Sequence, residues 1–303
     1  MKYFKHLQED FEDTYKLMNK TLHFAKVNIN ENIFSTEDIN QLIQIEIPNL
    51  IKNSPEKKIR SGGSFSFADV IDVGDNDSPI LLGNLTYSID KEPRILDKVK
   101  RTTEVTQLKN FANSASFLYD VNSEVLAYSS ADSINHNTFK KNFQHLLETN
   151  EKIGFVKIID YPKDHNVFEV FKSLNKITYV KFSIIPPNPK PLNRAKFKGI
   201  IDETKAKEMD ITLKDPKGNI DITKDDVDEL QTEENLAPTI AEGLEYVNQG
   251  YGTAIIRGEN KLAKKVNFQS KNHIEKTTLK ESSNVASLDR AISILKKLIT
   301  KKS

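Results

Sequence analysis

The sequence predicts an α+β fold: a mixed, largely antiparallel sheet with flanking helices, followed by a smaller α+β C-terminal part. Short β-rich segments separated by Gly, Asp, Asn and Ser fill residues 63–131, which is typical of antiparallel strands. Segments before and after them carry apolar residues at steps of three and four and predict helices. Four prolines within residues 186–191 cannot continue a strand ladder. They indicate a boundary between a sheet-rich domain, residues 1–187, and a smaller domain with basic and acidic segments, residues 188–303.

The N-terminal region is predicted to contain a helix, a strand and a second helix. Apolar spacing favours a helix over residues 3–18, and alternating apolar and polar residues favour a half-buried strand over residues 21–29. Ser35 precedes acidic residues and predicts the start of a helix that runs to about Asn53. Because proline lacks an N–H and clashes with the preceding turn, Pro48 is expected to kink or break that helix.

The central region is predicted to be antiparallel sheet followed by alternating strands and helices. The step from Tyr119 to Val125 has the length of a hairpin. The sheet strands are expected at residues 64–73, 80–89, 103–111, 114–121 and 124–130. A helix at 136–149, a strand at 153–161, a helix at 165–174 and a strand at 177–185 then predict a βαβ-like or split unit.

The C-terminal region is predicted to be a second mixture of helices and strands. A hairpin is expected to turn at Asp215, Pro216, Lys217 and Gly218, since this is strong turn chemistry. The expected elements are a helix near 203–209, the hairpin at 211–222, an acidic helix at 224–233, a helix at 237–248, strands at 252–258 and 264–270, and a final helix at 285–302.

Composition excludes several classes of protein. With 37% hydrophobic and 29% charged residues, the 303-residue chain has the composition of a soluble globular protein. No apolar run is long enough to span a membrane, and the N-terminus lacks the apolar core of a signal peptide, so we expect a cytoplasmic protein without membrane insertion. The absence of cysteine excludes disulfides, thiolate metal sites and cysteine nucleophiles.

Charge is strongly segregated along a chain whose net charge is only +1. Residues 170–201 contain seven basic and no acidic side chains, residues 202–235 contain 12 acidic and five basic ones, and residues 251–303 contain 12 basic and four acidic ones. The basic groups are mostly lysine, which suits phosphate contact better than the reading of base edges. This pattern favours a protein that binds the nucleic-acid backbone with little sequence preference.

Two basic segments with interleaved aromatic residues supply the candidate nucleic-acid-binding residues. Aromatic side chains occur at Tyr179, Phe182, Phe197 and Phe268 within them. An alternative reading is that the lysines lie on solvated faces and pair with the acidic stretch 202–235. The candidate residues are Lys172, Lys181, Lys190, Arg194, Lys196, Lys198, Lys264, Lys265 and Lys271.

No catalytic or cofactor motif stands out. The six histidines show no metal-binding spacing, and the glycine-rich stretches match no phosphate-binding loop, so the sequence predicts no cofactor and no resident metal. The strongest enzymatic alternative is a metal-dependent nuclease that uses Asp202, Glu203 and Lys205 in an ExK arrangement. This candidate site lacks the second acidic metal ligand that is expected shortly upstream, because residues 170–201 contain no acidic residue. The sequence therefore favours a non-enzymatic protein and leaves the nuclease as an alternative.

The final predicted helix carries an apolar stripe that must be covered. Leu288, Ile292, Leu295 and Ile299 recur at steps of four and three. They are expected to pack against the body of the protein or against a second copy. Because doubling a basic surface multiplies contacts to one polymer, we expect a homodimer with this helix at or near the interface.

The order of features over residues 170–240 resembles a family of phage-exclusion proteins. "ITYVKFSIIPPNP", "KPLNRAKFKGI", "DITLKDPKGNIDIT" and an acidic segment before "LAP" follow in succession. This order is similar to the C-terminal half of sensor proteins of the lambda Rex A type and of uncharacterised prokaryotic phage-defence proteins. The resemblance implies a cytoplasmic, dimeric DNA-binding protein. It further implies a role in antiviral defence, through phage exclusion and abortive infection.

The predicted partners are therefore nucleic acid, with DNA favoured over RNA, a second copy of the chain and an effector protein. A protein-interaction subunit without nucleic-acid binding is the remaining alternative, because segregated charge also serves protein partners.

Overall fold

The computed structural model describes residues 17, 20–30, 39–60, 62–74, 78–131, 133–163, 166–187, 196–224, 230–280 and 283–302. The chain forms two compact units, each assembled from three segments. Unit 1 comprises residues 1–22, 32–156 and 278–295, and unit 2 comprises residues 23–31, 157–277 and 296–303. The expected boundary between residues 187 and 188 falls inside unit 2, because a strand before it pairs with strands that follow it.

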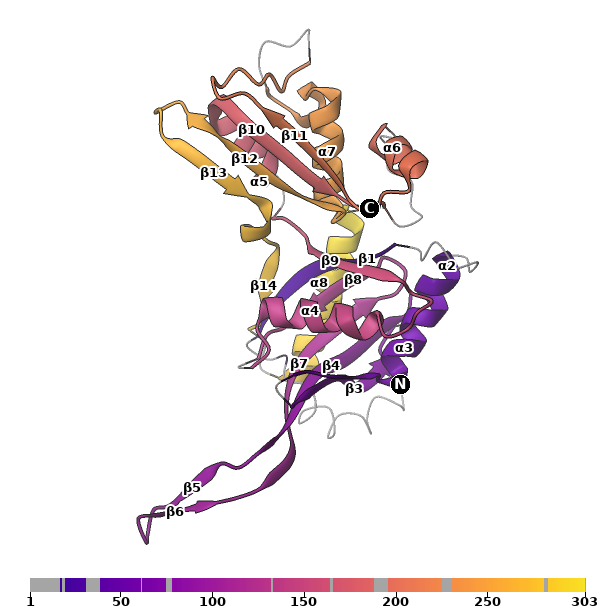
Figure 1. The fold of residues 1–303 in the computed structure, drawn as a ribbon, viewed down its shortest axis with the longest axis vertical. Coiled ribbons are helices and arrows are strands. Elements are labelled where there is room, and N and C mark those ends of the chain that lie inside the picture. The colour runs from indigo at the N-terminus through magenta and orange to yellow at the C-terminus, as the bar shows by residue number, and fades with distance from the viewer. Residues whose placement is uncertain are drawn as a thin grey trace. The chain divides into compact units, whose positions relative to one another are not determined.

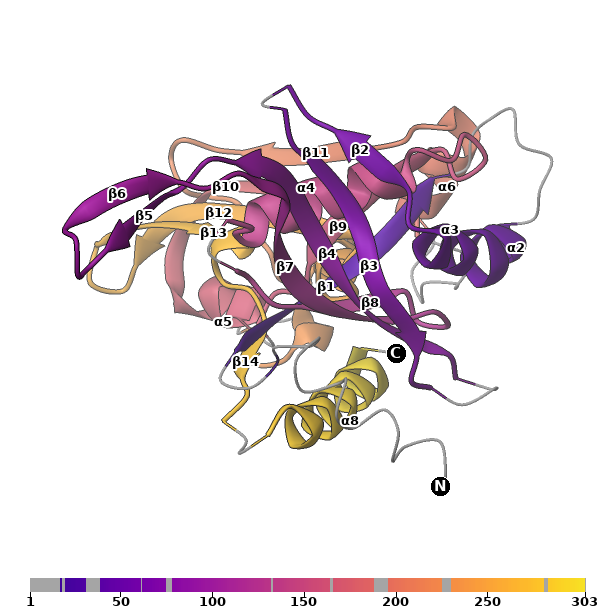
Figure 2. The same ribbon diagram turned by 90° about the horizontal axis from the view of Figure 1, so that it is seen from below.

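Unit 1 is built on an antiparallel sheet, and the predicted α+β class is confirmed. Its strands follow the order β8-β7-β4-β3-β2 (Figures 1 and 2). They are β2 (Glu56–Lys58), β3 (Ser64–Asp72), β4 (Ile80–Lys91), β7 (Leu108–Asp120) and β8 (Val125–Tyr128). Asp120 pairs with Val125, so the predicted hairpin between β7 and β8 is confirmed. The fourth predicted strand starts earlier than expected and merges with the end of the third into β7.

Beyond β3, strands β4 and β7 continue as a ribbon that ends in β5 (Arg94–Asp97) and β6 (Thr102–Val105). Figure 1 shows this ribbon projecting from the sheet of unit 1.

Helices cover the sheet of unit 1 through aromatic packing. The rings of Phe143 on α4 (His136–Leu147) and Phe117 on β7 meet edge to face, with centroids 5.2 Å apart. The N-terminal helical segment runs as α2 (Ile39–Gln41), η1 (Leu42–Glu46) and α3 (Ile47–Asn53). Pro48 comes directly after the π-type turn η1, and because the backbone stays helical at Glu46 and Ile47, the helical path is irregular there but does not end.

Strand β1 (Thr21–Asn30) confirms the predicted N-terminal strand and lies largely in unit 2. It pairs with β9 (Phe155–Asp160) and β14 (Lys276–Thr278). Helix α8 (Asn284–Lys302) confirms the predicted final helix. The buried side chains of α8 include Leu288, Ala291, Leu295 and Leu298. Of the predicted stripe, Leu288 and Leu295 are buried within the chain and Ile292 and Ile299 are half-buried, and the homodimer stays a prediction.

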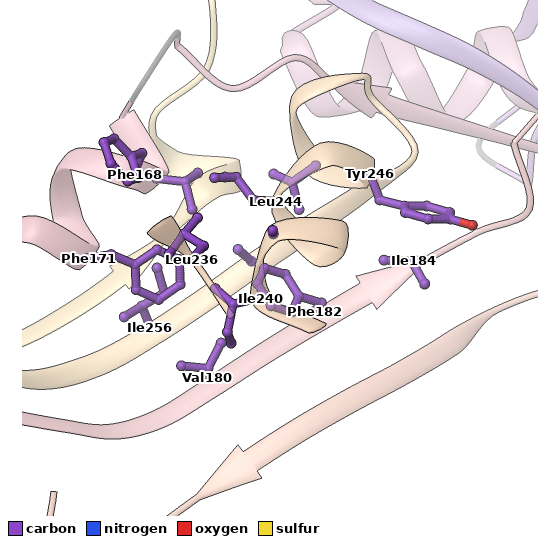
Figure 3. Packing of buried hydrophobic residues seen from close by; sticks show 14 of the residues in the cluster. Phe168, Phe171, Val180, Phe182, Ile184, Leu236, Ile240, Leu244, Tyr246 and Ile256 are labelled. Atoms are coloured by element: carbon purple, nitrogen blue, oxygen red, sulfur yellow. The ribbon is translucent and has the colours of Figure 1, made fainter. Parts of the chain in front are cut away.

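Unit 2 contains a four-stranded antiparallel sheet in the order β11-β10-β12-β13. The strands are β10 (Leu174–Ile184), β11 (Met209–Lys214), β12 (Gly252–Asn260) and β13 (Lys265–Gln269). Helices α5 (Asn166–Ser173) and α7 (Pro238–Asn248) bury their apolar sides against one face of this sheet. Figure 3 shows Phe171 of α5 and Leu244 of α7 in the same cluster of buried side chains as Val180 and Ile256 of the sheet. Only this face of the sheet belongs to the core.

Two C-terminal predictions are wrong. The helix expected near 203–209 is α6 (Lys196–Thr204), where Phe197 and Ile201 form a buried i, i+4 pair. The hairpin expected at 211–222 has its turn, closed by a 3.0 Å hydrogen bond from the N–H of Gly218 to the carbonyl of Asp215. Its second strand does not form, because β11 pairs with β10 instead.

The predicted acidic helix is also incorrect over its described part. Residues 230–232 are not helical, and Glu233–Asn235 form a short 3-10 turn, η2. Residues 225–229 lie outside the described residues, as does the predicted helix at 3–18 apart from the buried Leu17. A second 3-10 turn, η3 (Ser270–Asn272), follows β13.

Candidate nucleic-acid interface

The four-stranded sheet of unit 2 has a second face that side-chain alternation directs away from the core. On β10, Val180, Phe182 and Ile184 are buried among the core residues, so Tyr179 and Lys181 point to the opposite side. We call this side the open face. Its residues, taken from the strand register, are Lys176, Tyr179, Lys181, Ser183, Asp210, Thr212, Lys214, Thr253, Ile255, Arg257, Glu259, Lys265, Asn267 and Gln269.

Rows of directly paired residues organise the open face. In one row, Tyr179 pairs with Lys214 on one side and with Arg257 on the other, and Arg257 pairs with Asn267. The tyrosine therefore lies between two cations on neighbouring strands. Directly paired side chains in antiparallel sheets are close enough to act together on one ligand.

The central contact of this row joins Arg257 and Tyr179. The guanidinium carbon of Arg257 lies 4.8 Å from the ring centroid of Tyr179, within the range of a cation–π interaction. Arg257 is exposed and Tyr179 is half-buried. Because the guanidinium lies over one face of the ring, the contact brings a planar cation and an aromatic ring together at the same place on the open face.

A diagonal ion pair joins the next two rows and engages one predicted residue, because Lys181 pairs with Thr212 in one row and Asp210 pairs with Ser183 in the other. Lys181 Nζ lies 2.7 Å from a carboxylate oxygen of Asp210. This hydrogen bond lowers the pKa of Asp210 below its ordinary value, with a further contribution from Ser183, and it raises the pKa of Lys181. Both side chains remain accessible to solvent, so Lys181 can contact a ligand on the open face while it stays paired with Asp210.

The predicted candidate residues do not form one cluster. Lys181 and Lys265 belong to the open face, and Lys264 lies in the adjoining turn between β12 and β13. Lys172 lies on α5, on the other side of the sheet, and forms an ion pair of 3.6 Å with Glu169. The remaining described candidates are Lys196 and Lys198 on α6 and Lys271 in η3, while Lys190 and Arg194 lie outside the described residues.

Some candidate lysines do pair with the acidic stretch, as the alternative reading expected. Lys181 pairs with Asp210, and Lys198 pairs with Asp202 one helical turn away. Lys265 has no ion pair with the described residues. The two readings therefore each apply to part of the basic set.

Sequence reasoning missed Lys214 and Arg257. Lys214 lies in the acidic stretch and Arg257 is a single cation in an apolar strand, so neither stands out in the sequence. The strict alternation of apolar and polar residues along Met209–Lys214 is the sequence signal that could have identified Lys214 as outward-facing. Nothing local to Arg257 indicates that it pairs with Tyr179. Of the interleaved aromatic residues, Phe182, Phe197 and Phe268 are buried in the core of unit 2.

The candidate nuclease residues lie at the end of α6. Asp202 is engaged by Lys198, and Lys205 follows the helix in a left-handed conformation with φ of 54°. Among the described residues, no group of three or more His, Asp or Glu side chains is placed to share a metal ion. Within the same residues, no helix has both the length and the apolarity needed to cross a membrane.

Comparison with known proteins yields one family. The model of a domain of unknown function, DUF4747, matches residues 20–300, which is nearly the whole chain. No curated protein matches the chain.

Proposed function

The chain belongs to the DUF4747 family, and we propose that it is a non-enzymatic protein that binds single-stranded nucleic acid on the open face of unit 2, with little sequence preference. The observation that carries this proposal is the row in which Lys214 and Arg257 flank Tyr179. Aromatic rings stack on any base, and lysine and arginine neutralise the adjoining phosphates.

The balance of charge on the open face supports an anionic ligand. The open face carries five cationic side chains and only two carboxylates, those of Asp210 and Glu259. Four of the five cations are lysines, which suit point contacts to phosphate better than the reading of base edges. Sequence tolerance follows from this choice of residue.

The width of the sheet favours a single strand over a duplex groove. Four strands at about 4.8 Å spacing measure about 14 Å between the outer backbones. This exceeds the roughly 12 Å width of the major groove of B-DNA, so the sheet cannot enter it. Bases of a single strand can instead lie flat against the exposed sheet, as stacking on Tyr179 requires.

DNA is the first polymer to test, because the sequence favours it over RNA. We propose further that binding serves an antiviral defence system of the phage-exclusion or abortive-infection kind, in the cytoplasm. This part of the proposal is supported by the resemblance over residues 170–240 alone.

The test measures fluorescence anisotropy of a labelled twelve-residue oligothymidylate with the full chain at two salt concentrations. We expect Tyr179→Ala to weaken binding by about tenfold, since stacking contributes about 1–3 kcal/mol per base. Lys214→Ala is expected to make the dependence of log K on log salt shallower by about 0.7. Lys172→Ala is the matched control, because Lys172 is a lysine on α5 at the other side of the sheet.

Equal loss in Lys172→Ala and Lys214→Ala would overturn the assignment to the open face. Binding that ignores salt would overturn the electrostatic account and favour a protein-interaction subunit. Cleavage of the oligonucleotide with magnesium that Glu203→Ala abolishes would favour the nuclease.

A further inference from the structure

The ribbon formed by residues 89–111, which we call the arm, has no neighbouring strand on either edge within the part of the chain that the structure describes. The β3–β4 pairing stops at Ser88, and the β7–β8 pairing begins only at Phe117. The arm is continuous: Lys91 pairs with Leu108, the N–H of Thr106 donates to the carbonyl of Pro93 at 3.0 Å, and β5 then pairs with β6. The ten residue-to-residue steps from Ile89 to Val99 give a reach of about 33 Å.

The arm exposes apolar side chains to an unusual degree. Five of the eight large hydrophobic residues exposed in the described part of the chain lie on it, and Val99 at its tip is 93% exposed. An isolated two-stranded hairpin is marginal in water, and exposed apolar clusters commonly indicate a binding site. Besides Val99, the exposed large hydrophobic residues of the arm are Ile95, Leu96, Val105 and Leu108.

The two faces of the arm differ in charge. Arg94 pairs with Val105 and Leu96 pairs with Thr103, so these four side chains share one face of the β5–β6 ladder and none of them is acidic; we call it the basic face. Ile95 pairs with Glu104 and Asp97 pairs with Thr102, so both carboxylates of β5 and β6 lie on the opposite, acidic face.

The tip adds positive charge next to these faces. The turn contains Lys98, Lys100 and Arg101, and Asp97 accepts hydrogen bonds from the backbone of Val99 and Lys100 at 2.9 and 3.0 Å. Lys100 also approaches the Asp97 carboxylate at 3.8 Å, whereas Lys98 and Arg101 form no ion pair with the described residues. The turn therefore presents cations around Val99.

We propose that the arm enters the major groove of duplex DNA, with the basic face against the base edges and the tip cations on phosphate groups. A two-stranded ribbon fits this groove, whereas the four-stranded sheet of unit 2 does not. Leu96 and Val105 offer apolar contact to thymine methyl groups, and Arg94 can donate to guanine. The proposal goes beyond the single-strand binding proposed above and uses residues of unit 1 only.

A second copy of the chain fits the arm less well. The cations at the tip would repel those of a copy, and five apolar side chains provide a few hundred Å², less than the roughly 1,200 Å² at which stable interfaces begin. Charged residues along both edges also oppose the addition of a further strand. Charge complementarity therefore favours an anionic polymer.

The test compares adjacent residues on opposite faces of the arm. Ile95 and Leu96 are equally exposed, at 55% and 56%, and differ in the face that they occupy. We expect Leu96→Ser combined with Val105→Ser to weaken binding of a labelled 24-base-pair duplex by about tenfold, since two apolar contacts are lost. Ile95→Ser is the matched control and is expected to change binding by less than about twofold. Circular dichroism on both variants checks that unit 1 remains folded.

A change in the DNA tests the groove. Replacing thymidine by deoxyuridine removes a methyl group that only the major groove presents. We expect the wild-type chain to bind the deoxyuridine duplex about threefold more weakly than the thymidine duplex, and the Leu96→Ser, Val105→Ser variant not to distinguish them. Equal binding of both duplexes by the wild type, or equal effects of the two arm variants, overturns the proposal. A fall in sedimentation mass in the Leu96→Ser, Val105→Ser variant indicates a second copy instead and also overturns it.

The oligothymidylate assay on the same proteins separates this proposal from the one for the open face. Arm variants that lose duplex binding and retain single-strand binding support both proposals. If the arm variants lose duplex binding and the wild-type chain does not bind the oligothymidylate, the proposal for the arm is supported and the proposal for the open face is refuted. If the arm variants leave duplex binding unchanged while single-strand binding depends on Tyr179, only the proposal for the arm is refuted.

Discussion

The carboxylate of Glu242 on α7 accepts a hydrogen bond from the backbone N–H of Phe197, in the first turn of α6, at 2.5 Å. Glu242 is buried, so its charge is placed in a protected position at the positive end of the α6 dipole. The ring of Phe197 also lies against that of Tyr246, with centroids 6.1 Å apart. Together these contacts fix α6 to α7.

Removal of the Glu242 carboxylate is expected to release α6. Glu242→Leu leaves the buried N–H of Phe197 without its acceptor and should lower the free energy of unfolding of unit 2 by about 1–3 kcal/mol. Glu242→Gln keeps an acceptor and should have a smaller effect. Hydrogen exchange of the α6 amides measures the release, and equal exchange in the wild type and Glu242→Leu would contradict it.

Two helical glycines are expected to respond to alanine in opposite directions. A Cβ on Gly243 in α7 would lie 2.5 Å from the ring of Phe182, so Gly243→Ala should overpack the core and lower the free energy of unfolding by about 1–3 kcal/mol. A Cβ on Gly199 in α6 meets nothing within 4 Å. Gly199→Ala should therefore raise the free energy of unfolding by about 0.5–1 kcal/mol. Urea unfolding checks both, and shifts of the same sign would contradict the close approach of α7 to the sheet.

Asp210 is expected to restrain binding on the open face. Asp210→Asn removes a negative charge and releases Lys181 to the nucleic acid, so affinity for oligothymidylate should rise about threefold and the salt slope should steepen by about 0.7. Asp221→Asn is the matched control, because it removes the same charge from a carboxylate that accepts its hydrogen bonds from Thr223 in a separate turn. Anisotropy titrations of both variants at two salt concentrations give the comparison. A gain in both variants would indicate a net-charge effect.

The shape of Arg257 is expected to matter as well as its charge. Arg257→Lys keeps the cation and loses the planar group that lies over Tyr179, so affinity for oligothymidylate should fall about threefold at an unchanged salt slope. Arg290→Lys, at an exposed position of α8, is the control. Unchanged affinity of Arg257→Lys for oligothymidylate would show that the arginine acts only as a point charge.

The Lys181–Asp210 pair is expected to give a pH-dependent contribution to stability. The pKa of Asp210 lies below its ordinary value of 3.8, so the ionised carboxylate stabilises the folded state above that pH. The contribution is lost as pH falls through the lower pKa of the folded state. In Lys181→Met the pKa should rise toward 3.8 without reaching it, because the hydrogen bond from Ser183 remains. Carbon-detected NMR titration of the Asp210 carboxyl measures this, and an unchanged midpoint would contradict the assigned cause.

Local periodicity accounts for most of the elements that the sequence predicted. The apolar spacing of α4, α7 and α8 and the alternation of β1, β10 and β12 repeat over a few residues, and each element forms close to its expected place. The expectation failed at α6, whose start depends on an acceptor, Glu242, that lies 45 residues away in the sequence. It also failed at the hairpin of 211–222, because strong turn residues specify a turn and not the partner of the strand before it.

The sequence by itself determined the α+β class, the segregation of charge and the concentration of cations in the C-terminal half. Tertiary structure alone decided which of those cations share a surface: it joined Tyr179 to Arg257, 78 residues later, and to Lys214 from the acidic stretch, and it placed Lys172 on the other side of the sheet. The physical reason is that side-chain alternation is a local property of one strand, whereas strand register is set by packing between distant segments. Charge could be counted along the chain, but the open face exists only after the strands have paired.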